Sequence, residues 1–131
     1  MPAQPPPSVL VADDQPDIRT LLGITLEREG LDVRFAANGA EAVAAYLERP
    51  AHLVILDVKM PVLDGPEALT LLLALDPAVR CCFVTGYADP RLAARLLAQG
   101  ALEVLFKPFR LGELAGTVRR LLGVRSAATG S

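Results

Sequence analysis

The sequence predicts an α/β fold, a doubly wound parallel sheet of five strands flanked by five helices. Short apolar runs alternate along the chain with segments whose apolar residues recur at helical spacing. The runs are mostly unbroken, as expected for strands that are buried on both faces of a sheet. Four of the runs end in residues suited to handling a phosphoryl group, namely Asp13–Asp14, Asp57, Thr85 and Lys107.

The N-terminal half is expected to contain, in order, a strand over 9–12, a helix over 16–29, a strand over 31–36 and a helix over 38–49. Gly30 is placed to end the first helix. Glu41 follows Asn38 by three residues, which is a capping-box pattern for the start of the second helix.

The C-terminal half is expected to contain a strand ending at Asp57, a helix from Asp64 to before Pro77 and a strand ending at Thr85. A helix from Asp89 to before Gly100 and a strand over 104–106 should follow. The last helix is expected to carry its apolar residues on one face, namely Leu111, Leu114, Val118, Leu121 and Leu122. Asp64 and Glu67 form a second capping-box pattern. Asp89 followed by Pro90 is a helix start with proline in its first position.

Length and composition favour one domain over residues 8–124 of this 131-residue sequence, with a flexible proline-rich head at 1–7 and a flexible tail at 125–131. The net charge of −2 argues against broad nucleic-acid or membrane surfaces and favours protein partners. Neither a signal-peptide pattern nor a membrane-spanning apolar stretch is present, so a cytoplasmic location is expected.

Three residues with reactive side chains are expected to be structural. Cys81 and Cys82 are neighbours in a strand and should face opposite sides of the sheet as buried, reduced thiols. His52 precedes a strand instead of following it, and is expected to be a surface or structural residue.

The carboxyl ends of parallel strands meet at one edge of a sheet, so the polar strand ends should converge there. Asp13, Asp14 and Asp57 would repel one another unless a hard cation such as Mg²⁺ lay between them. Asp57 could then act as a nucleophile and form an aspartyl-phosphate. An ammonium from Lys107 and a hydroxyl from Thr85 fit the stabilisation of the transferring phosphoryl group.

Taken singly, each of these residues also has a structural explanation. Asp14 could cap the first helix, and Asp57 could be a turn residue after a buried strand. Thr85 could be a β-branched strand end, and Lys107 could pair with any of the acids. Only the phosphoryl-site interpretation explains residue type and strand-end position together at all four places.

The chain resembles the receiver domain of bacterial two-component response regulators over essentially the whole folded region. The matching segments, in family order and spacing, are 9–14, 53–65, 84–88 and 106–109. The resemblance implies a flavodoxin-like fold with strand order 2-1-3-4-5 and a receiver that is not a conventional enzyme. It implies a phosphoryl donor that is a histidine kinase or a histidine phosphotransfer protein, and a downstream protein target. The expected target surface is the face of the fourth and fifth helices.

By this resemblance Asp57 is the phosphoacceptor, and Mg²⁺ (or Mn²⁺) is bound directly by Asp14 and largely through water by Asp13. The backbone carbonyl of Lys59 would be a further metal ligand. Thr85 and Lys107 would contact the phosphoryl oxygens, and the Lys107–Pro108 bond is expected to be cis.

Two features bear on how such a receiver would behave. Many receivers carry an aromatic residue three positions before the lysine, where this chain has Val104, so the usual aromatic switch is missing. Tyr87 and Lys59 flank Thr85 and Asp57, and we hypothesise that they slow hydrolysis of the acyl phosphate.

Several other functions are kept open. A pseudo-receiver would bind partners without phosphorylation, and the chain could be a receiver from a larger hybrid kinase or DNA-binding regulator. A haloacid-dehalogenase-like phosphatase would need an acid where Lys59 stands. A flavodoxin-like electron carrier would need a phosphate-binding loop in place of Asp13–Asp14. The oligomeric state could be a monomer or a phosphorylation-dependent dimer.

Overall fold

The computed structural model describes residues 5–86 and 89–123, and there it has five strands and five helices in strict alternation. The elements are β1 (Ser8–Ala12), α1 (Pro16–Glu27), β2 (Asp32–Ala36), α2 (Gly39–Glu48), β3 (Leu53–Asp57), α3 (Gly65–Leu75), β4 (Cys81–Thr85), α4 (Pro90–Gln99), β5 (Glu103–Phe106) and α5 (Leu111–Leu122). All strand pairs are parallel, in the order β2-β1-β3-β4-β5. The predicted fold class and strand order are therefore confirmed.

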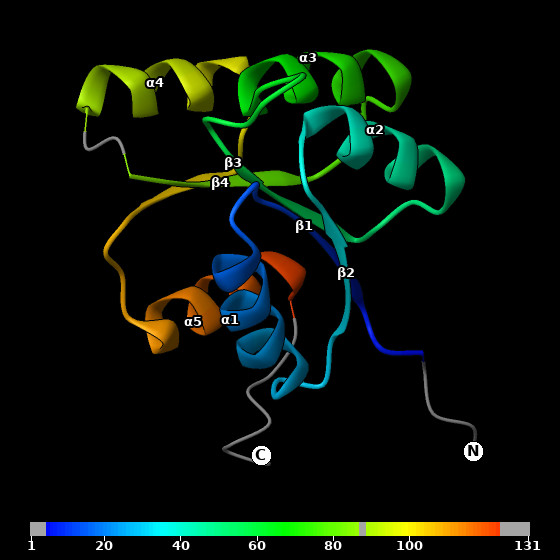
Figure 1. The fold of residues 1–131 in the computed structure, drawn as a ribbon, viewed down its shortest axis with the longest axis vertical. Coiled ribbons are helices and arrows are strands. Elements are labelled where there is room, and N and C mark those ends of the chain that lie inside the picture. The colour runs from blue at the N-terminus through cyan, green and yellow to red at the C-terminus, as the bar shows by residue number, and fades with distance from the viewer. Residues whose placement is uncertain (1–4, 87–88, 124–131) are drawn as a thin grey trace.

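The sheet lies between two layers of helices, with α1 and α5 on one face and α2, α3 and α4 on the other (Figure 1). Successive strand residues point to opposite faces, so each strand contributes to two separate apolar cores. Leu10, Leu56 and Phe83 belong to the core under α2, α3 and α4. Val9 and Ile55 belong to the core under α1 and α5. This double burial explains why the strand sequences are continuously apolar.

Both cysteines are completely buried, and they lie in different cores, as predicted. Burial raises the pKa of the Cys81 thiol to about 12 and raises the pKa of Cys82 as well. Because the thiolate is the reactive form, we expect both thiols to react with a thiol-specific reagent only when the chain unfolds. The reaction rate, followed against urea concentration, should track global unfolding. Rapid labelling of either cysteine in the native protein would contradict this.

Helix starts follow the predicted capping patterns with one difference. The Asp64–Glu67 capping box is complete, with hydrogen bonds of 2.9 and 3.0 Å in its two directions. The Asp89 side chain accepts from the Arg91 amide, as expected for a cap. The Asn38 side chain accepts from the Glu41 amide, but Glu41 accepts from the Ala37 amide instead of closing the box on Asn38.

The first helix was predicted too long, and Leu111 was wrongly placed on the apolar face of the last helix. α1 ends at Glu27, because the chain tightens into short turns that bond the amides of Glu29 and Gly30 to Leu26 and Glu27, and Gly30 then takes a φ of 82°. In α5 the apolar face begins at Leu114, since Leu111 is 39% exposed.

His52 is exposed and structural, as predicted, because its Nδ1 accepts a hydrogen bond of 3.0 Å from the Ser8 amide. This contact ties the start of β1 to the residue before β3. None of the described helices combines the length and apolar character needed to span a bilayer. The tail predicted at 125–131, and residues 1–4 of the predicted head, lie outside the described residues.

Candidate functional site

The polar strand ends converge at one edge of the sheet. Ala12, which precedes Asp13, pairs with Leu56, which precedes Asp57. The end of β4 is fastened to the segment after β5, because the Lys107 amide donates to the Thr85 carbonyl at 2.7 Å. Residues from the first, third, fourth and fifth strands therefore share one site, as the sequence predicted.

Three carboxylates form the acidic part of this site. Oxygen atoms of Asp13, Asp14 and Asp57 all lie within 4.8 Å of one another. Asp13 is 1% exposed and Asp57 is 9% exposed, whereas Asp14 is open to solvent. Hard oxygen donors at this spacing fit a divalent cation such as Mg²⁺, which takes one or two carboxylates and keeps several waters. The exposed Asp14 would give such a cation access to solvent.

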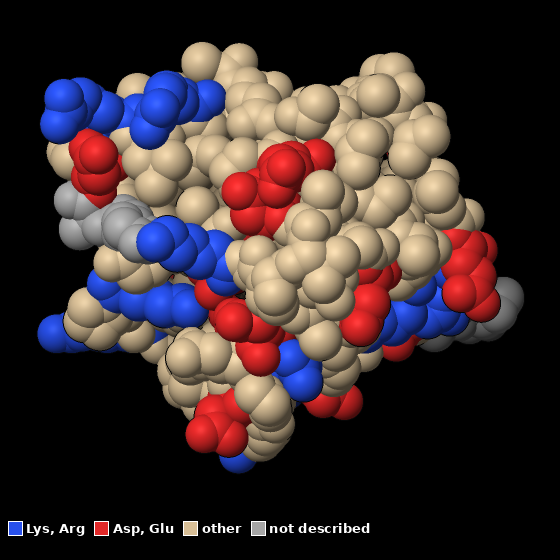
Figure 2. Space-filling view, turned by 45° about the horizontal axis from the view of Figure 1, so that its top comes forward, with Lys and Arg blue, Asp and Glu red and all other residues tan. Residues whose placement is uncertain are grey.

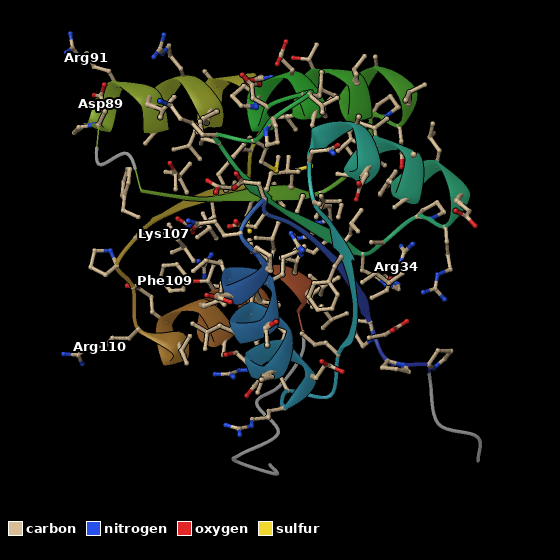
Figure 3. The ribbon with its side chains drawn as sticks, viewed as in Figure 1. Arg34, Asp89, Arg91, Lys107, Phe109 and Arg110 are labelled. Carbon is tan, nitrogen blue, oxygen red and sulfur yellow. The ribbon has the colours of Figure 1, made fainter. Side chains whose placement is uncertain are left out.

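Lys107 supplies the positive charge of the site. Its Nζ lies 3.3 Å from Asp13 Oδ2 and 3.5 Å from Asp57 Oδ2, so one ammonium serves two buried carboxylates. Figure 3 shows Lys107 near the sheet, whereas Arg91 and Arg110 point away from the body of the molecule. The Lys107–Pro108 peptide bond is cis, as predicted.

One ammonium does not neutralise the whole cluster, and the imbalance appears at Asp57. Burial and the neighbouring Asp13 carboxylate raise the pKa of Asp57 from 3.8 to about 6, and Lys107 offsets only part of this rise. Without a divalent cation, the Asp57 carboxylate is therefore less stable than it would be in water.

This pKa shift predicts an unusual pH dependence of stability. Between pH 3.8 and about 6 the folded protein holds a proton on Asp57 that the unfolded chain has released. In EDTA this group therefore lowers the free energy of unfolding as pH rises across that interval. Saturating Mg²⁺ should remove the loss, because the cation compensates the carboxylate charge. The free energy of unfolding of wild type and Asp57→Asn, measured by urea unfolding across this pH range, checks the prediction. If the two proteins showed the same pH dependence of this free energy in EDTA, the prediction would be contradicted.

The buried carboxylate of Asp13 is held in place by the backbone that follows it. Asp13 Oδ1 accepts from the Gln15 amide at 2.9 Å, and the Arg19 side chain donates to the Asp13 carbonyl at 2.7 Å. The capping explanation of Asp14 is wrong, because Gln15 is the N-cap of α1 and no side chain caps that helix. Asp14 is thus available to a ligand.

The other residues singled out from the sequence lie in or beside β3, β4 and β5. Thr85 is 1% exposed at the end of β4. Lys59 has an exposed side chain and lines a surface hollow together with Asp14, Met60, Pro61 and Asp64. Val104 is half-buried in β5, opposite Phe83. Tyr87, the other residue expected to shield the site, lies outside the described residues.

Two glycines hold the connection that follows Asp57. Their contacts with this connection were not identified from the sequence. A Cβ on Gly65 would lie 2.2 Å from the Asp57 carbonyl oxygen, and one on Gly39 would lie 2.2 Å from the Leu63 carbonyl oxygen. The sequence did contain one signal for these contacts. Both α2 and α3 begin with glycine, although alanine is the better helix former.

The surface shown in Figure 2 carries charges of both signs. Figure 2 shows acidic and basic side chains next to one another near the middle of the face it presents, with a wide uncharged surface beside them. Basic residues of α5 are neutralised as well, since Arg119 pairs with Glu29 and Arg120 with Glu103. Among the described residues on this face and on α5, the charges therefore differ from the continuous basic patch typical of nucleic-acid binding.

Comparisons with known proteins agree with this geometry. Residues 9–119 match the family described as response regulator receiver domain. The transcriptional regulatory protein PrrA of Mycobacterium tuberculosis is 41% identical over 128 residues, covering 95% of this chain and 54% of PrrA. The chain thus spans about half the length of that curated relative. Sporulation initiation phosphotransferase F of Bacillus subtilis is 33% identical and is covered over 95% of its length, with 90% of this chain.

Solved structures show the same similarity in three dimensions. The receiver domain of Francisella response regulator 1452 superposes with a TM-score of 0.85 at 28% identity, covering 89% of this chain and 97% of that one. The CheX–CheY–BeF3–Mg²⁺ complex from Borrelia burgdorferi includes a chain with a TM-score of 0.85 at 27% identity, covering 88% of this chain and 89% of that one. The chain belongs to the response regulator receiver domains of two-component signalling.

Proposed function

We propose that this receiver accepts a phosphoryl group on Asp57 from a phosphohistidine of a histidine kinase or histidine phosphotransfer protein. The observation that carries the proposal is the Lys107 ammonium, which lies within 3.5 Å of Asp57 and also contacts the buried Asp13. A cation held against a carboxylate at the end of a strand suits a reaction that brings a dianionic phosphoryl group to that carboxylate.

In the proposed reaction, one Asp57 carboxylate oxygen attacks phosphorus in line with the histidine nitrogen. The oxygen–phosphorus bond forms as the nitrogen–phosphorus bond breaks, and the bonding electron pair returns to the imidazole, which takes up a proton. Charge spreads over the equatorial phosphoryl oxygens, where the Lys107 ammonium and the Thr85 hydroxyl would stabilise it. Attack of water on the acyl phosphate later regenerates Asp57 and releases inorganic phosphate.

A divalent cation, Mg²⁺ or Mn²⁺, would be held by Asp13, Asp14, Asp57 and the Lys59 carbonyl. It would supply positive charge to the phosphoryl oxygens as they approach the carboxylates. The presence of Mg²⁺ in the Borrelia complex with CheY supports this proposal. The Lys59 side chain, which lines the hollow beside Asp14, would shield the acyl phosphate from water.

The phosphorylated receiver would signal to a protein target through α4, β5 and α5. Val104 lies in this face and has no ring to rotate, so switching would depend on movement of the β4–α4 connection and α4, or on the changed charge of the site. The curated relative PrrA is a transcriptional regulatory protein about twice as long as this chain's match. A receiver that serves as part of a larger regulator is therefore a second candidate role.

Intact-mass analysis after incubation with acetyl phosphate tests the proposal. Wild type should gain one phosphoryl group in Mg²⁺ and none in EDTA, and Asp57→Asn should gain none. Asp32→Asn is the matched control, because Asp32 lies at the start of β2, at the other edge of the sheet, and is outside the acidic cluster.

An adduct that persists in Asp57→Asn, or that forms equally in EDTA, would refute the assigned chemistry. Because small donors serve some receivers poorly, the wild type is also incubated with a phosphorylated histidine phosphotransfer protein. Failure with both donors would favour the pseudo-receiver.

A further inference from the structure

The connection between β3 and α3, residues 58–64, contains the one described non-glycine residue with a positive φ. Val62 has a φ of 69°, a region that β-branched side chains rarely adopt. The Leu63 amide donates to the Pro61 carbonyl at 2.7 Å, so the three residues form a γ-turn around Val62. Val62 is 82% exposed and gains almost nothing from packing. Its neighbours must therefore impose this conformation.

Those neighbours hold the connection from both sides of the turn. Met60 is 9% exposed and belongs to the core under α2, α3 and α4, and Leu63 packs against the same core. The Gly65 amide donates to the Val58 carbonyl at 2.9 Å and closes the base of the connection. Val62 is left to span the distance between Pro61 and Leu63.

The anchor from outside this segment is Gly39, the first residue of α2. Its amide donates to the Leu63 carbonyl at 2.9 Å. A Cβ at Gly39 would lie 2.2 Å from that carbonyl oxygen, 2.8 Å from the Leu63 carbonyl carbon and 3.0 Å from the Asp64 carbonyl oxygen. All three atoms belong to the backbone, so a side chain at residue 39 could be accommodated only if the connection and the start of α2 moved apart.

We propose that Gly39 is a positioning residue for the cation site. Because Gly39 has no side chain, α2 can pack close to the 58–64 connection and hold it in the position in which Lys59 lines the hollow beside Asp14. A displaced Leu63 would release the turn at Val62, and the connection would carry Lys59 away from Asp14. The inference rests on the proposed function in assuming that a divalent cation binds there.

The test compares Gly39→Ala with Gly112→Ala. Gly112 is also in the first turn of a helix, and an added Cβ there meets nothing within 4 Å. We expect Gly39→Ala to weaken Mg²⁺ binding about tenfold in calorimetry, a loss of about 1.4 kcal/mol, and Gly112→Ala to leave it unchanged. In Mg²⁺-free protein, the amide resonances of residues 58–60 should shift in the first variant only.

Adding Val62→Gly provides a further readout that a purely structural role for Gly39 would not give. Glycine adopts a positive φ without strain, so the turn at residue 62 has less tendency to open when Leu63 is displaced. The Gly39→Ala/Val62→Gly protein should therefore recover part of the lost Mg²⁺ affinity. Gly39→Ala with normal Mg²⁺ affinity and unshifted amides at 58–60 would overturn the proposal.

A measurement on the wild type covers the case in which Gly39→Ala does not fold. Coupling between two sites is reciprocal, so Mg²⁺ must strengthen the Gly39–Leu63 contact by the factor by which the contact strengthens Mg²⁺ binding. Hydrogen exchange of the Gly39 amide should slow about tenfold in saturating Mg²⁺, and an unchanged rate would refute the proposal. A wild type that binds Mg²⁺ without becoming phosphorylated would instead refute only the proposed function.

Discussion

Replacing Lys107 with methionine is expected to slow phosphorylation of Asp57 by a factor of about 10²–10³, the usual effect of removing one preorganised donor from a charged transition state. Methionine preserves much of the aliphatic chain and removes the ammonium that lies 3.3 Å from Asp13 and 3.5 Å from Asp57. The initial rate of adduct formation with acetyl phosphate at saturating Mg²⁺ measures the effect. A wild-type rate in the methionine variant would exclude Lys107 from the reaction.

The same substitution should change cation binding in the opposite direction. With the Lys107 ammonium gone, Mg²⁺ no longer competes with it for Asp13 and Asp57, so Mg²⁺ should bind more tightly. Tighter Mg²⁺ binding together with slower phosphorylation would separate a role in the reaction from simple damage to the site. Lys107→Arg keeps the charge but presents a planar fork, so its phosphorylation rate should lie between the other two.

Gly65→Ala is expected to lower the free energy of unfolding by about 3 kcal/mol, at the upper end of the usual cost of overpacking a core. Its Cβ would lie 2.2 Å from the Asp57 carbonyl oxygen and 2.7 Å from the Phe83 ring. Phe83 is completely buried and cannot easily yield, so either the backbone of Asp57 or the start of α3 has to move. A displacement of about 1 Å can cost a factor of 10², and phosphorylation should fall accordingly.

Gly116→Ala is the control for Gly65→Ala. Gly116 also lies in a helix, and the nearest atom to its added Cβ is the end of the Arg119 side chain at 3.9 Å. Alanine there should stabilise the protein by up to about 1 kcal/mol through helix propensity. Urea unfolding and phosphorylation rates measured on both variants check the prediction. Equal stability of Gly65→Ala and wild type would show that α3 can shift away from β3 at little cost.

Much of the fold was predictable because its signals are local. Apolar runs of strand length, helical spacing and cap residues such as Asp64 and Asp89 each depend on a few neighbouring residues. The convergence of Asp13, Asp57 and Lys107 was predictable too, because parallel strands bring their carboxyl ends together.

Features that neither a local pattern nor the parallel topology implies were not predictable. Asp13 and Asp14 are neighbours in sequence, yet one is buried against Lys107 and the other faces solvent. The close approach of Gly39 to Leu63 joins residues from different connections, so no local pattern marks it. The strained conformation of Val62 is hidden for the same reason, since its own sequence favours an extended backbone.

The burial of the strands on both faces has a consequence for how the sheet selects its register. A slip by one residue would exchange the two faces of a strand, but both faces meet an apolar core, so hydrophobic patterning penalises the slip only weakly. The polar strand ends do penalise it, because a shift would draw Asp57 or Thr85 into the sheet interior. The residues proposed to handle the phosphoryl group thus also help to specify the alignment of the folded chain.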